Sequence, residues 1–272
     1  MRNKGNVLTG RTALVTGGAR NIGLAVAKAL ASDGADVAVV DICRDLETIP
    51  YSMSDRRTLE KAVSEISNHG VRSLGLTCDV RAEDQVKTSI ERVIREFGQL
   101  DILVNNAGVM SLFPIAELSE KAWDEVVDVC LKGAFLCCKQ AIAHMATRRY
   151  GKIINIASVA GQVGLGMSTH YCAAKHGVLG LTKALAKEVA GLSINVNAVC
   201  PGTVESPMLE GLASQLALDE EVYEHFSQKH LFQDRHITPA DIARAVRWLA
   251  SDESRCITGT TITVDAGWSA GG

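Results

Sequence analysis

Short runs of apolar, mostly β-branched residues alternate with helical patterns along nearly the whole chain, and this alternation restricts the possible folds more than any other feature. Seven such runs are separated by six helical patterns, which is typical of repeated βαβ units and of a parallel sheet. The runs 38–40 and 102–104 contain only Ala, Val, Ile and Leu, as strands buried on both faces do. The sequence therefore predicts an α/β fold with a doubly wound, seven-stranded parallel sheet and helices on both faces.

No Pro-, Gly- or Ser-rich linker interrupts the alternation, so residues 1–272 are expected to form one domain. Two connections, 42–57 and 201–238, are longer than a plain link requires, and such long connections are usually functional. Ligands of open α/β sheets bind at the carboxyl ends of the strands, where both segments are expected to leave the sheet. The predicted strands are 12–16, 36–41, 73–78, 100–105, 152–157, 193–199 and 260–264, and the predicted helices are 22–32, 58–69, 83–97, 120–147, 171–190 and 239–250.

Composition and charge argue against several classes of protein. The formal net charge is 28 − 31 = −3 with scattered basic residues, so no strong field attracts nucleic acid or an anionic membrane. The eight cysteines have neither a CxxC pair nor zinc-ligand spacing, which predicts reduced thiols and no metal site. No apolar run approaches the roughly 18 residues that span a bilayer, and the polar start lacks a signal-peptide core. We therefore expect a cytoplasmic protein that binds neither nucleic acid nor membrane.

A glycine-rich turn, TGGARNIG at 16–23, connects the first predicted strand to the first predicted helix. Such a turn lets backbone amides approach a pyrophosphate, which also lies at the positive end of the helix. Asp41 ends the second predicted strand, 24 residues after Gly17, about where a partner of the ribose 2′-hydroxyl is expected. The two features predict a dinucleotide site, with a turn that binds no ligand as the alternative.

Asp41 favours NAD over NADP because its carboxylate would repel the additional 2′-phosphate of NADP. Arg20 argues in the opposite direction, since a cation beside the turn is suited to that phosphate. Asp41 carries more weight because it is expected to contact the ribose directly. The predicted cofactor is therefore NAD.

Tyr171 and Lys175 lie four residues apart in a predicted helix, so their side chains share one face. A tyrosine with a pKa near 10 is a poor base, but an ammonium within about 4–6 Å lowers that pKa by about 1–3 units. Beside an oxidised nicotinamide, such a tyrosine can take the proton of an alcohol and return it in reduction. A Tyr and a Lys on a surface helix are the alternative, but Ser158, 13 residues before Tyr171 at a strand end, favours the catalytic interpretation.

Together, these motifs resemble the short-chain dehydrogenase/reductase family, whose turn reads TGxxxGxG, over nearly the whole chain. The resemblance implies a Rossmann-type fold in which Ser158 hydrogen-bonds the substrate oxygen and Tyr171 is the acid/base. It also implies that Lys175 binds the nicotinamide ribose and lowers the pKa of Tyr171. In the family, Asp79 and Val80 correspond to an adenine contact, 105–108 (NNAG) to a cofactor loop, and 201–208 to the nicotinamide-side loop. The predicted cofactor contacts are Gly17, Arg20, Asn21, Ile22, Asp41, Ile42, Asp79, Val80, Asn106, Ala107, Gly108, Tyr171, Lys175, Pro201, Gly202, Val204 and Ser206.

The sequence departs from the family pattern at two positions. Asn21 stands where the turn has its middle glycine, and Asn is the residue that best tolerates a positive φ after Gly. Cys130 stands where the family has an Asn that holds a water linking the lysine to solvent. Because Cys is a weak hydrogen-bonding group, we expect slower proton relay.

The segment that follows Asp41 resembles an insertion found in one subgroup of the family. The stretch DICRDLETIPYSMSDRR begins at Asp41 and resembles carveol-type dehydrogenases and the mycofactocin-associated members, as does 237–259. We expect residues 42–57 to fold over the adenosine end of the cofactor and slow its exchange. An ordinary surface excursion is the alternative.

The residues expected around the substrate are mainly apolar, with no Arg or Lys cluster for a carboxylate or phosphate. His170 and Gln162 are the nearby polar residues, and a half-exposed structural role is expected for His170. The sequence thus predicts an uncharged secondary alcohol or ketone, alicyclic, terpenoid or steroid-like. The candidate lining residues are Val109, Met110, Val159, Val163, Leu165, Met208, Leu209 and Leu212.

Two other functions compete with an NAD-dependent secondary-alcohol oxidoreductase. The first is an NADPH-dependent 3-oxoacyl thioester reductase, which shares the same triad and against which Asp41 and the insertion argue. The second is a catalytically weak NAD-binding protein, suggested by Cys130 and Asn21 and opposed by the intact Tyr171 and Lys175. The family resemblance also implies a homotetramer, paired through helices that carry 130–145 and 171–190.

Overall fold

The strands of the protein pair into one parallel sheet. The computed structural model describes residues 7–217, 222–232 and 234–270. Within these residues the strand order is β3-β2-β1-β4-β5-β6-β7, so the order reverses between β1 and β4, where open α/β sheets bind ligands. This sheet confirms the predicted fold class. The strands are β1 (Thr12–Thr16), β2 (Asp36–Asp41), β3 (Ser73–Thr77), β4 (Ile102–Asn105), β5 (Gly151–Ile156), β6 (Ile194–Pro201) and β7 (Thr261–Val264).

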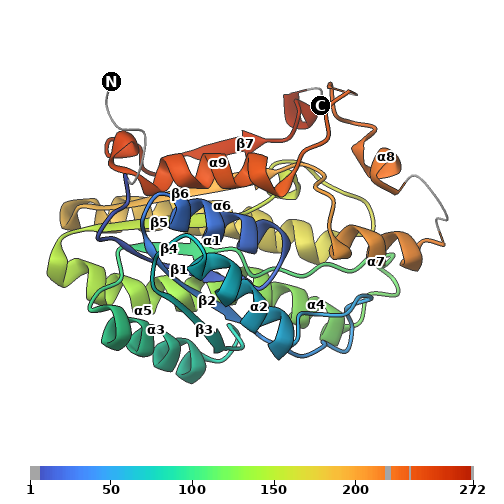
Figure 1. Ribbon diagram of the computed structural model, residues 1–272. Helices are drawn as coiled ribbons and strands as arrows, with labels where there is room; N and C mark the ends of the chain where they lie inside the picture. The colour runs from blue at the N-terminus through green and yellow to red at the C-terminus, as the bar shows by residue number, and fades with distance from the viewer. Residues whose placement is uncertain (1–6, 218–221, 233, 271–272) are drawn as a thin grey trace.

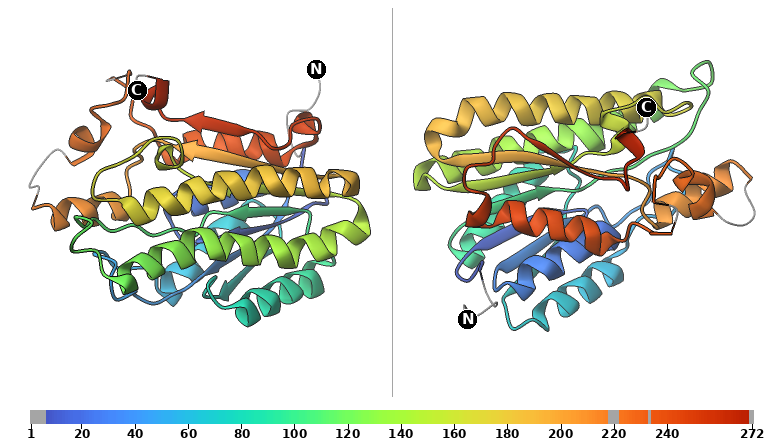
Figure 2. Two further views of the ribbon diagram at one scale, coloured as in Figure 1. Left: turned by 180° about the vertical axis from the view of Figure 1, so that it is seen from behind. Right: turned by 90° about the horizontal axis from the view of Figure 1, so that it is seen from above.

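Helices cover both faces of the sheet (Figures 1 and 2). One face packs against α1 (Asn21–Ser32), α2 (Arg56–Ser67) and α9 (Pro239–Ala250), with Val26, Leu30 and Val246 fully buried between them. The other face packs against α3 (Glu83–Phe97), α4 (Glu120–Val127), α5 (Gly133–Arg148) and α6 (Thr169–Val189). No helix in the described ranges is long and apolar enough to cross a membrane.

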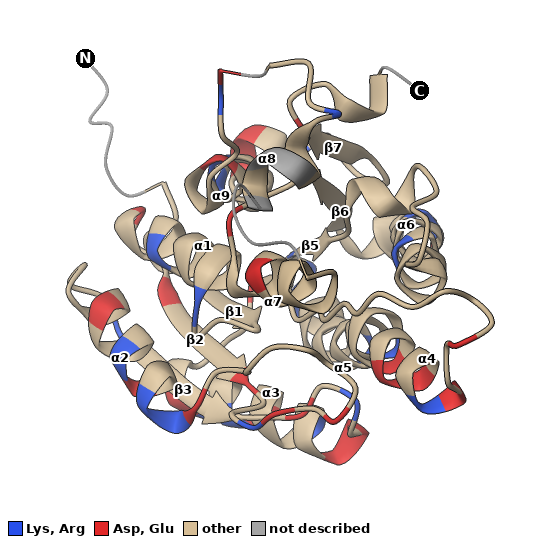
Figure 3. Cartoon of the chain, turned by 90° about the vertical axis from the view of Figure 1, so that its right-hand side faces the viewer, with Lys and Arg blue, Asp and Glu red and all other residues tan. Residues whose placement is uncertain are grey.

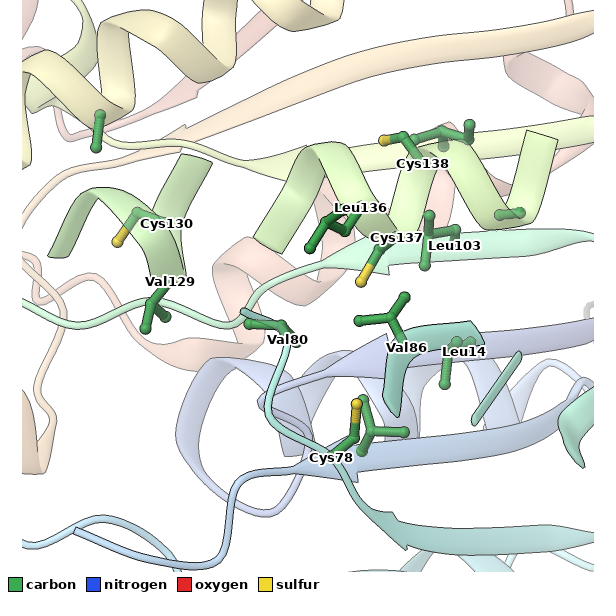
Figure 4. Packing of buried hydrophobic residues seen from close by; sticks show 14 of the residues in the cluster. Leu14, Cys78, Val80, Val86, Leu103, Val129, Cys130, Leu136, Cys137 and Cys138 are labelled. Atoms are coloured by element: carbon green, nitrogen blue, oxygen red, sulfur yellow. The ribbon is translucent and has the colours of Figure 1, made fainter. Parts of the chain in front are cut away.

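The cysteines belong largely to the second of these cores. Figure 4 shows Cys78, Cys137 and Cys138 among Val and Leu side chains that join α5 to the sheet. All eight cysteines are free, and burial raises the pKa of Cys138 to about 12. The buried ones pack as small apolar side chains, as the sequence predicts for most of the eight.

The structure corrects the predicted helices at two places. The helix predicted over 120–147 is interrupted by a π-helical turn, Asp128–Lys132, in which the N–H of Gly133 bonds to the carbonyl of Asp128. Segment 201–238 is not an irregular loop, since it contains α7 (Pro207–Gln215) and α8 (Val222–Ser227). Ser206 caps α7 by accepting from the N–H of Leu209, and Pro207 follows at the first helical position, a start signal that the prediction did not use.

Candidate active site

A cavity of about 600 Å³ opens at the carboxyl end of the sheet. Figure 3 looks onto this end, with α7 in front of the strand ends. Residues that follow six of the strands line the cavity, namely Gly17, Ile42, Cys78, Asn106, Ala157 and Gly202. Every residue predicted from the sequence to be catalytic or to contact the cofactor also lines it, so the structure brings the whole predicted set together.

The glycine-rich turn is fixed by close backbone packing. Gly17 has φ +60, and a Cβ there would lie 3.0 Å from the Cα of Ala107. A Cβ on Gly23 would lie 2.1 Å from the carbonyl oxygen of Gly17, so only glycine fits both positions. Asn21 has φ +47, the left-handed conformation expected of it, and its amide Nδ2 donates to the carbonyl of Glu205 at 2.8 Å. The asparagine thus ties the turn to the loop after β6.

The start of α1 fits a pyrophosphate. Arg20, at the N-cap position of this twelve-residue helix, offers no side-chain cap. The N–H of Ile22 in the first turn donates to Asn21 Oδ1 at 2.8 Å, so the helix presents its positive end to the cavity with only one first-turn amide bonded to a side chain of the described residues. Asn106 holds the turn in place, because its Nδ2 donates to the carbonyl oxygens of Thr16 at 2.9 Å and Gly17 at 3.0 Å. Uncapped amides at the positive end of a helix bind anions well. The turn and the helix end are therefore suited to a dinucleotide.

Asp41 and Arg20 differ in their hydrogen-bond partners. The carboxylate of Asp41 lies at the cavity and accepts a 3.2 Å hydrogen bond from the N–H of Ala19. Burial raises the pKa of Asp41, and the hydrogen bond from Ala19 and the charge of Arg20 oppose that rise. The guanidinium of Arg20 donates to the carbonyl of Ser52 at 2.8 Å, so it is engaged by the insertion.

The Ser–Tyr–Lys set meets at the ends of β5 and α6. Ser158 follows β5, and its Oγ accepts from the N–H of Ala160 at 3.1 Å, which leaves its hydroxyl hydrogen to donate. Tyr171 lies in the first turn of α6, one helical turn before Lys175. The Nζ of Lys175 donates to the carbonyl of Ile156 at 2.8 Å and lies 5.5 Å from the centre of the Tyr171 ring.

The protein groups around Tyr171 do not produce the lowered pKa that the sequence predicts. Burial is the largest effect and raises the pKa of Tyr171 well above its usual value, with Cys130 acting in the same direction. A hydrogen bond with the Ser158 side chain lowers the pKa but does not outweigh burial. Among the described residues, the ammonium of Lys175 donates to a carbonyl at the end of β5 and lies beside the Tyr171 ring rather than in a hydrogen bond with its hydroxyl. Tyr171 is therefore a protonated phenol among its protein neighbours.

Cys130 occupies the π-helical turn beside the catalytic set. Its thiol is buried and donates to the carbonyl of Val109 at 3.4 Å. A Cβ built on Gly108 would lie 3.6 Å from this sulfur and 3.5 Å from Nζ of Lys175, so the thiol and the ammonium flank the same glycine. The thiol of Cys130 thus lies close to Lys175, but it donates its weak hydrogen bond to a backbone carbonyl.

The segment between β2 and α2, residues 42–57, contributes to the cavity wall and is called the insertion here after its sequence-based interpretation. Ile42, Leu46, Tyr51, Met53 and Ser54 all line the cavity. Sequence reasoning placed this segment near the cofactor but singled out only Ile42 among these residues. The Pro-Tyr pair at 50–51 was the available signal, because a large aromatic in a polar surface excursion is unusual.

Two contacts fasten the insertion to the body of the protein. Arg44 pairs with Asp79 at 2.9 Å, and Asp79 is also held by Arg81 at 2.7 Å. Thr48 donates through both its N–H and its hydroxyl to Glu125 of α4, at 2.9 and 2.6 Å. The segment is thus tied down on two sides of the cavity.

The substrate side of the cavity is largely apolar, although Gln228 and Lys229 also line it, and it differs from the predicted lining at three of the predicted residues. Val163 does not line it, and Gln162 donates to Thr263 away from it. His170 is fully buried rather than half-exposed, with Nε2 at 3.0 Å from the Ser111 hydroxyl, because α6 carries it inward. The predicted residues that do line the cavity are Val109, Met110, Val159, Leu165, Met208, Leu209 and Leu212, and those that the prediction missed include Leu112, Met167, Leu216, Phe226 and Trp268.

The known proteins that this chain resembles, compared below, are named as reductases or dehydrogenases, which agrees with a site suited to a dinucleotide. Residues 17–269, most of the chain, match the family described as enoyl-(acyl carrier protein) reductase. The chain is 40% identical over 257 residues to the 3-oxoacyl-[acyl-carrier-protein] reductase FabG of Staphylococcus aureus, which covers 94% of this chain and 97% of that protein.

Two solved structures resemble the protein over nearly their whole length. The first is carveol dehydrogenase from Mycobacterium avium in complex with NAD, with a TM-score of 0.92 and 31% identity, covering 97% of this chain and 99% of that one. The second is levodione reductase, with a TM-score of 0.88 and 31% identity, covering 96% and 98%. Sequence, sheet topology and the arrangement of Ser158, Tyr171 and Lys175 lead to one conclusion. The chain belongs to the short-chain dehydrogenase/reductase family of oxidoreductases.

Proposed function

We propose that the protein is an NAD-dependent oxidoreductase that interconverts a secondary alcohol and a ketone on an uncharged, apolar, alicyclic or terpenoid substrate. The observation that carries this proposal is the position of Tyr171. It lies with Ser158 and Lys175 in the same cavity as Asp41 and the glycine-rich turn. Leu, Met and Val supply many of the other side chains that line that cavity.

The cofactor assignment rests on two side chains. Asp41 presents a carboxylate where the adenosine ribose is expected, and a carboxylate there repels a 2′-phosphate. Arg20, whose charge would favour NADP, donates a hydrogen bond to the carbonyl of Ser52. A cation already bound by the insertion is less available to a phosphate, so both observations favour NAD.

The protein groups act on the substrate oxygen and its proton. When bound, NAD supplies the hydride acceptor for oxidation and the hydride donor for reduction. Ser158 donates its hydroxyl hydrogen to the substrate oxygen and so holds the reacting carbon in place. Tyr171 takes the hydroxyl proton during oxidation and returns it during reduction. Lys175 contributes a positive charge beside the phenol, which favours the phenolate.

The competing substrate is a 3-oxoacyl thioester, because the Staphylococcus aureus relative is named as a reductase of that class. The apolar cavity and the covering insertion argue for the cyclic alternative, in line with the two structural relatives named for carveol and levodione. We retain the homotetramer and the cytoplasmic location as further parts of the proposal.

The test is a spectrophotometric assay at 340 nm with purified protein. NAD⁺ is combined with cyclic, terpenoid and steroid alcohols, and NADH and NADPH with 3-oxoacyl thioesters. We expect many turnovers per subunit with one group of cyclic alcohols and a preference for NAD(H). Faster reduction of thioesters with NADPH would instead establish the competing function.

We also propose that residues 42–57 cover the cofactor and slow its release. The contacts of Thr48 with Glu125 anchor the cover on a helix that does not line the cavity. In Glu125→Ala both hydrogen bonds are lost, and we expect NADH to dissociate about tenfold faster, since one or two such bonds contribute about 1–2 kcal/mol. Stopped-flow displacement of NADH measures this rate.

The matched control for this prediction is Glu120→Ala, five residues earlier on α4, where the side chain is exposed. This variant should release NADH at the rate of the wild type. Equal dissociation rates in both variants, or loss of NAD from the wild type in a single desalting step, would show that the segment is an ordinary surface excursion.

A further inference from the structure

Contacts with two other segments hold the side chain of Tyr51 at the wall of the cavity. Its ring packs against α7, where a Cβ on Gly211 would lie 2.5 Å from the Cβ of Tyr51. Its hydroxyl oxygen accepts a 3.1 Å hydrogen bond from the N–H of Met110, in the loop that follows β4. The side chain therefore joins the insertion, α7 and the β4 loop, and its hydroxyl has a fixed position at the cavity wall.

The hydrogen of this hydroxyl is left to donate. A phenol oxygen both accepts and donates, and the N–H of Met110 uses only its acceptor role. In the described part of the chain no protein group accepts the hydrogen of Tyr51. Burial raises the pKa of Tyr51 well above its usual value, so the group keeps its proton. The Tyr51 side chain is half-buried and lines the cavity, so the acceptor available to this hydrogen is a group that occupies the cavity.

Tyr51 borders the same part of the cavity as the catalytic tyrosine. Both side chains line the one cavity, and the Met110 N–H that bonds to Tyr51 belongs to the loop that also contributes Asn106, Ala107 and Gly108 to the wall. One tyrosine comes from segment 42–57 and the other from α6, and apolar side chains such as Met110 and Leu212 line the same cavity. A ligand whose reacting oxygen is at Tyr171 is therefore within the same compartment as the Tyr51 hydroxyl.

We propose that Tyr51 is a specificity-determining residue that donates a hydrogen bond to a second oxygen of the substrate. The inference rests on the proposed function and narrows its substrate class. The substrate is an alicyclic ketone or secondary alcohol that carries a further hydroxyl, ether or carbonyl oxygen on its ring system. A site built to hydrogen-bond a substrate atom discriminates strongly against analogues that lack it, whereas an apolar wall does not.

Matched ketones test this proposal. The wild type, Tyr51→Phe and the control Tyr150→Phe are assayed with 2-, 3- and 4-hydroxycyclohexanone and with the methylcyclohexanones of the same substitution pattern. Tyr150 is a suitable control because its hydroxyl donates to Asp252, and it does not line the cavity. We expect the wild type to prefer one hydroxy ketone over its methyl counterpart at least tenfold in kcat/KM. Tyr51→Phe should lose that preference while reducing the methyl ketone as the wild type does.

The oxygen that accepts from Tyr51 belongs either to the substrate or to the cofactor, and the NADH dissociation constant of each variant distinguishes the two. If Tyr51→Phe weakens NADH binding and lowers kcat/KM for both ketones equally, the acceptor belongs to the cofactor and the proposal is wrong. An unchanged preference in Tyr51→Phe also overturns it. A wild type that reduces thioesters but no cyclic ketone contradicts the proposed function itself, and this inference with it.

Discussion

Tyr171→Phe is expected to lower kcat in both reaction directions by roughly a thousandfold, since general acid–base catalysis contributes about 10²–10⁴-fold. The substitution removes only the hydroxyl that exchanges the proton with the substrate oxygen. Ser158 and Lys175 keep their backbone contacts with Ala160 and Ile156, so the NADH affinity should remain within about threefold of the wild type. Initial rates at 340 nm and a fluorescence titration with NADH measure the two effects.

The pH dependence gives a second readout of the same residue. Because burial raises the pKa of Tyr171, the phenolate base is scarce near neutral pH and the phenol acid is abundant. We expect kcat/KM for alcohol oxidation to rise with pH up to the alkaline limit of the assay, while ketone reduction stays level over the same range because Tyr171 keeps its proton there. Tyr150→Phe should show wild-type profiles. A Tyr171→Phe enzyme that keeps more than a tenth of the activity would assign the proton transfer to another group.

The arrangement of the sheet and the placement of Ser158, Tyr171 and Lys175 at one cavity could be predicted because each depends on local signals. Periodicity marks the strands, and parallel pairing forces their carboxyl ends to one edge. A turn such as 16–23 places Gly17 and Gly23 where only glycine fits, so its conformation follows from its residues. The four-residue spacing of Tyr171 and Lys175 fixes their common helix face in the same way.

Features that depend on contacts between distant segments could not be predicted. Tyr51 lies at the cavity because its ring packs against Gly211, 160 residues further along the chain, and because its hydroxyl accepts a hydrogen bond from the N–H of Met110. The pKa of Tyr171 is governed by burial, which no spacing reveals. His170 is buried because α6 starts at Thr169 and turns that side chain inward, so a shift of a few residues in the predicted helix start misplaced it.

Removing the charge of Asp41 is expected to change the cofactor preference more than any other single substitution outside the triad. Hydrogen bonds to a charged group contribute about 1.5–3 kcal/mol, so Asp41→Asn should lower kcat/KM with NAD⁺ by about 10–100-fold. The same change removes the repulsion of a 2′-phosphate, so kcat/KM with NADP⁺ should rise. Asn preserves the size of the side chain and an oxygen for the N–H of Ala19. The ratio of the two kcat/KM values measures the shift.

Asp36→Asn is the matched control, because Asp36 lies at the amino end of the same strand and pairs with Arg72 outside the cavity. Its cofactor preference should equal that of the wild type. A tenfold or larger shift confined to Asp41→Asn would identify this carboxylate as the group that reads the ribose. If the wild type already prefers NADP(H) and neither variant alters the ratio, Arg20 reads the cofactor despite its contact with Ser52. The thioester reductase then becomes the better description, because the argument from Asp41 against NADPH no longer holds.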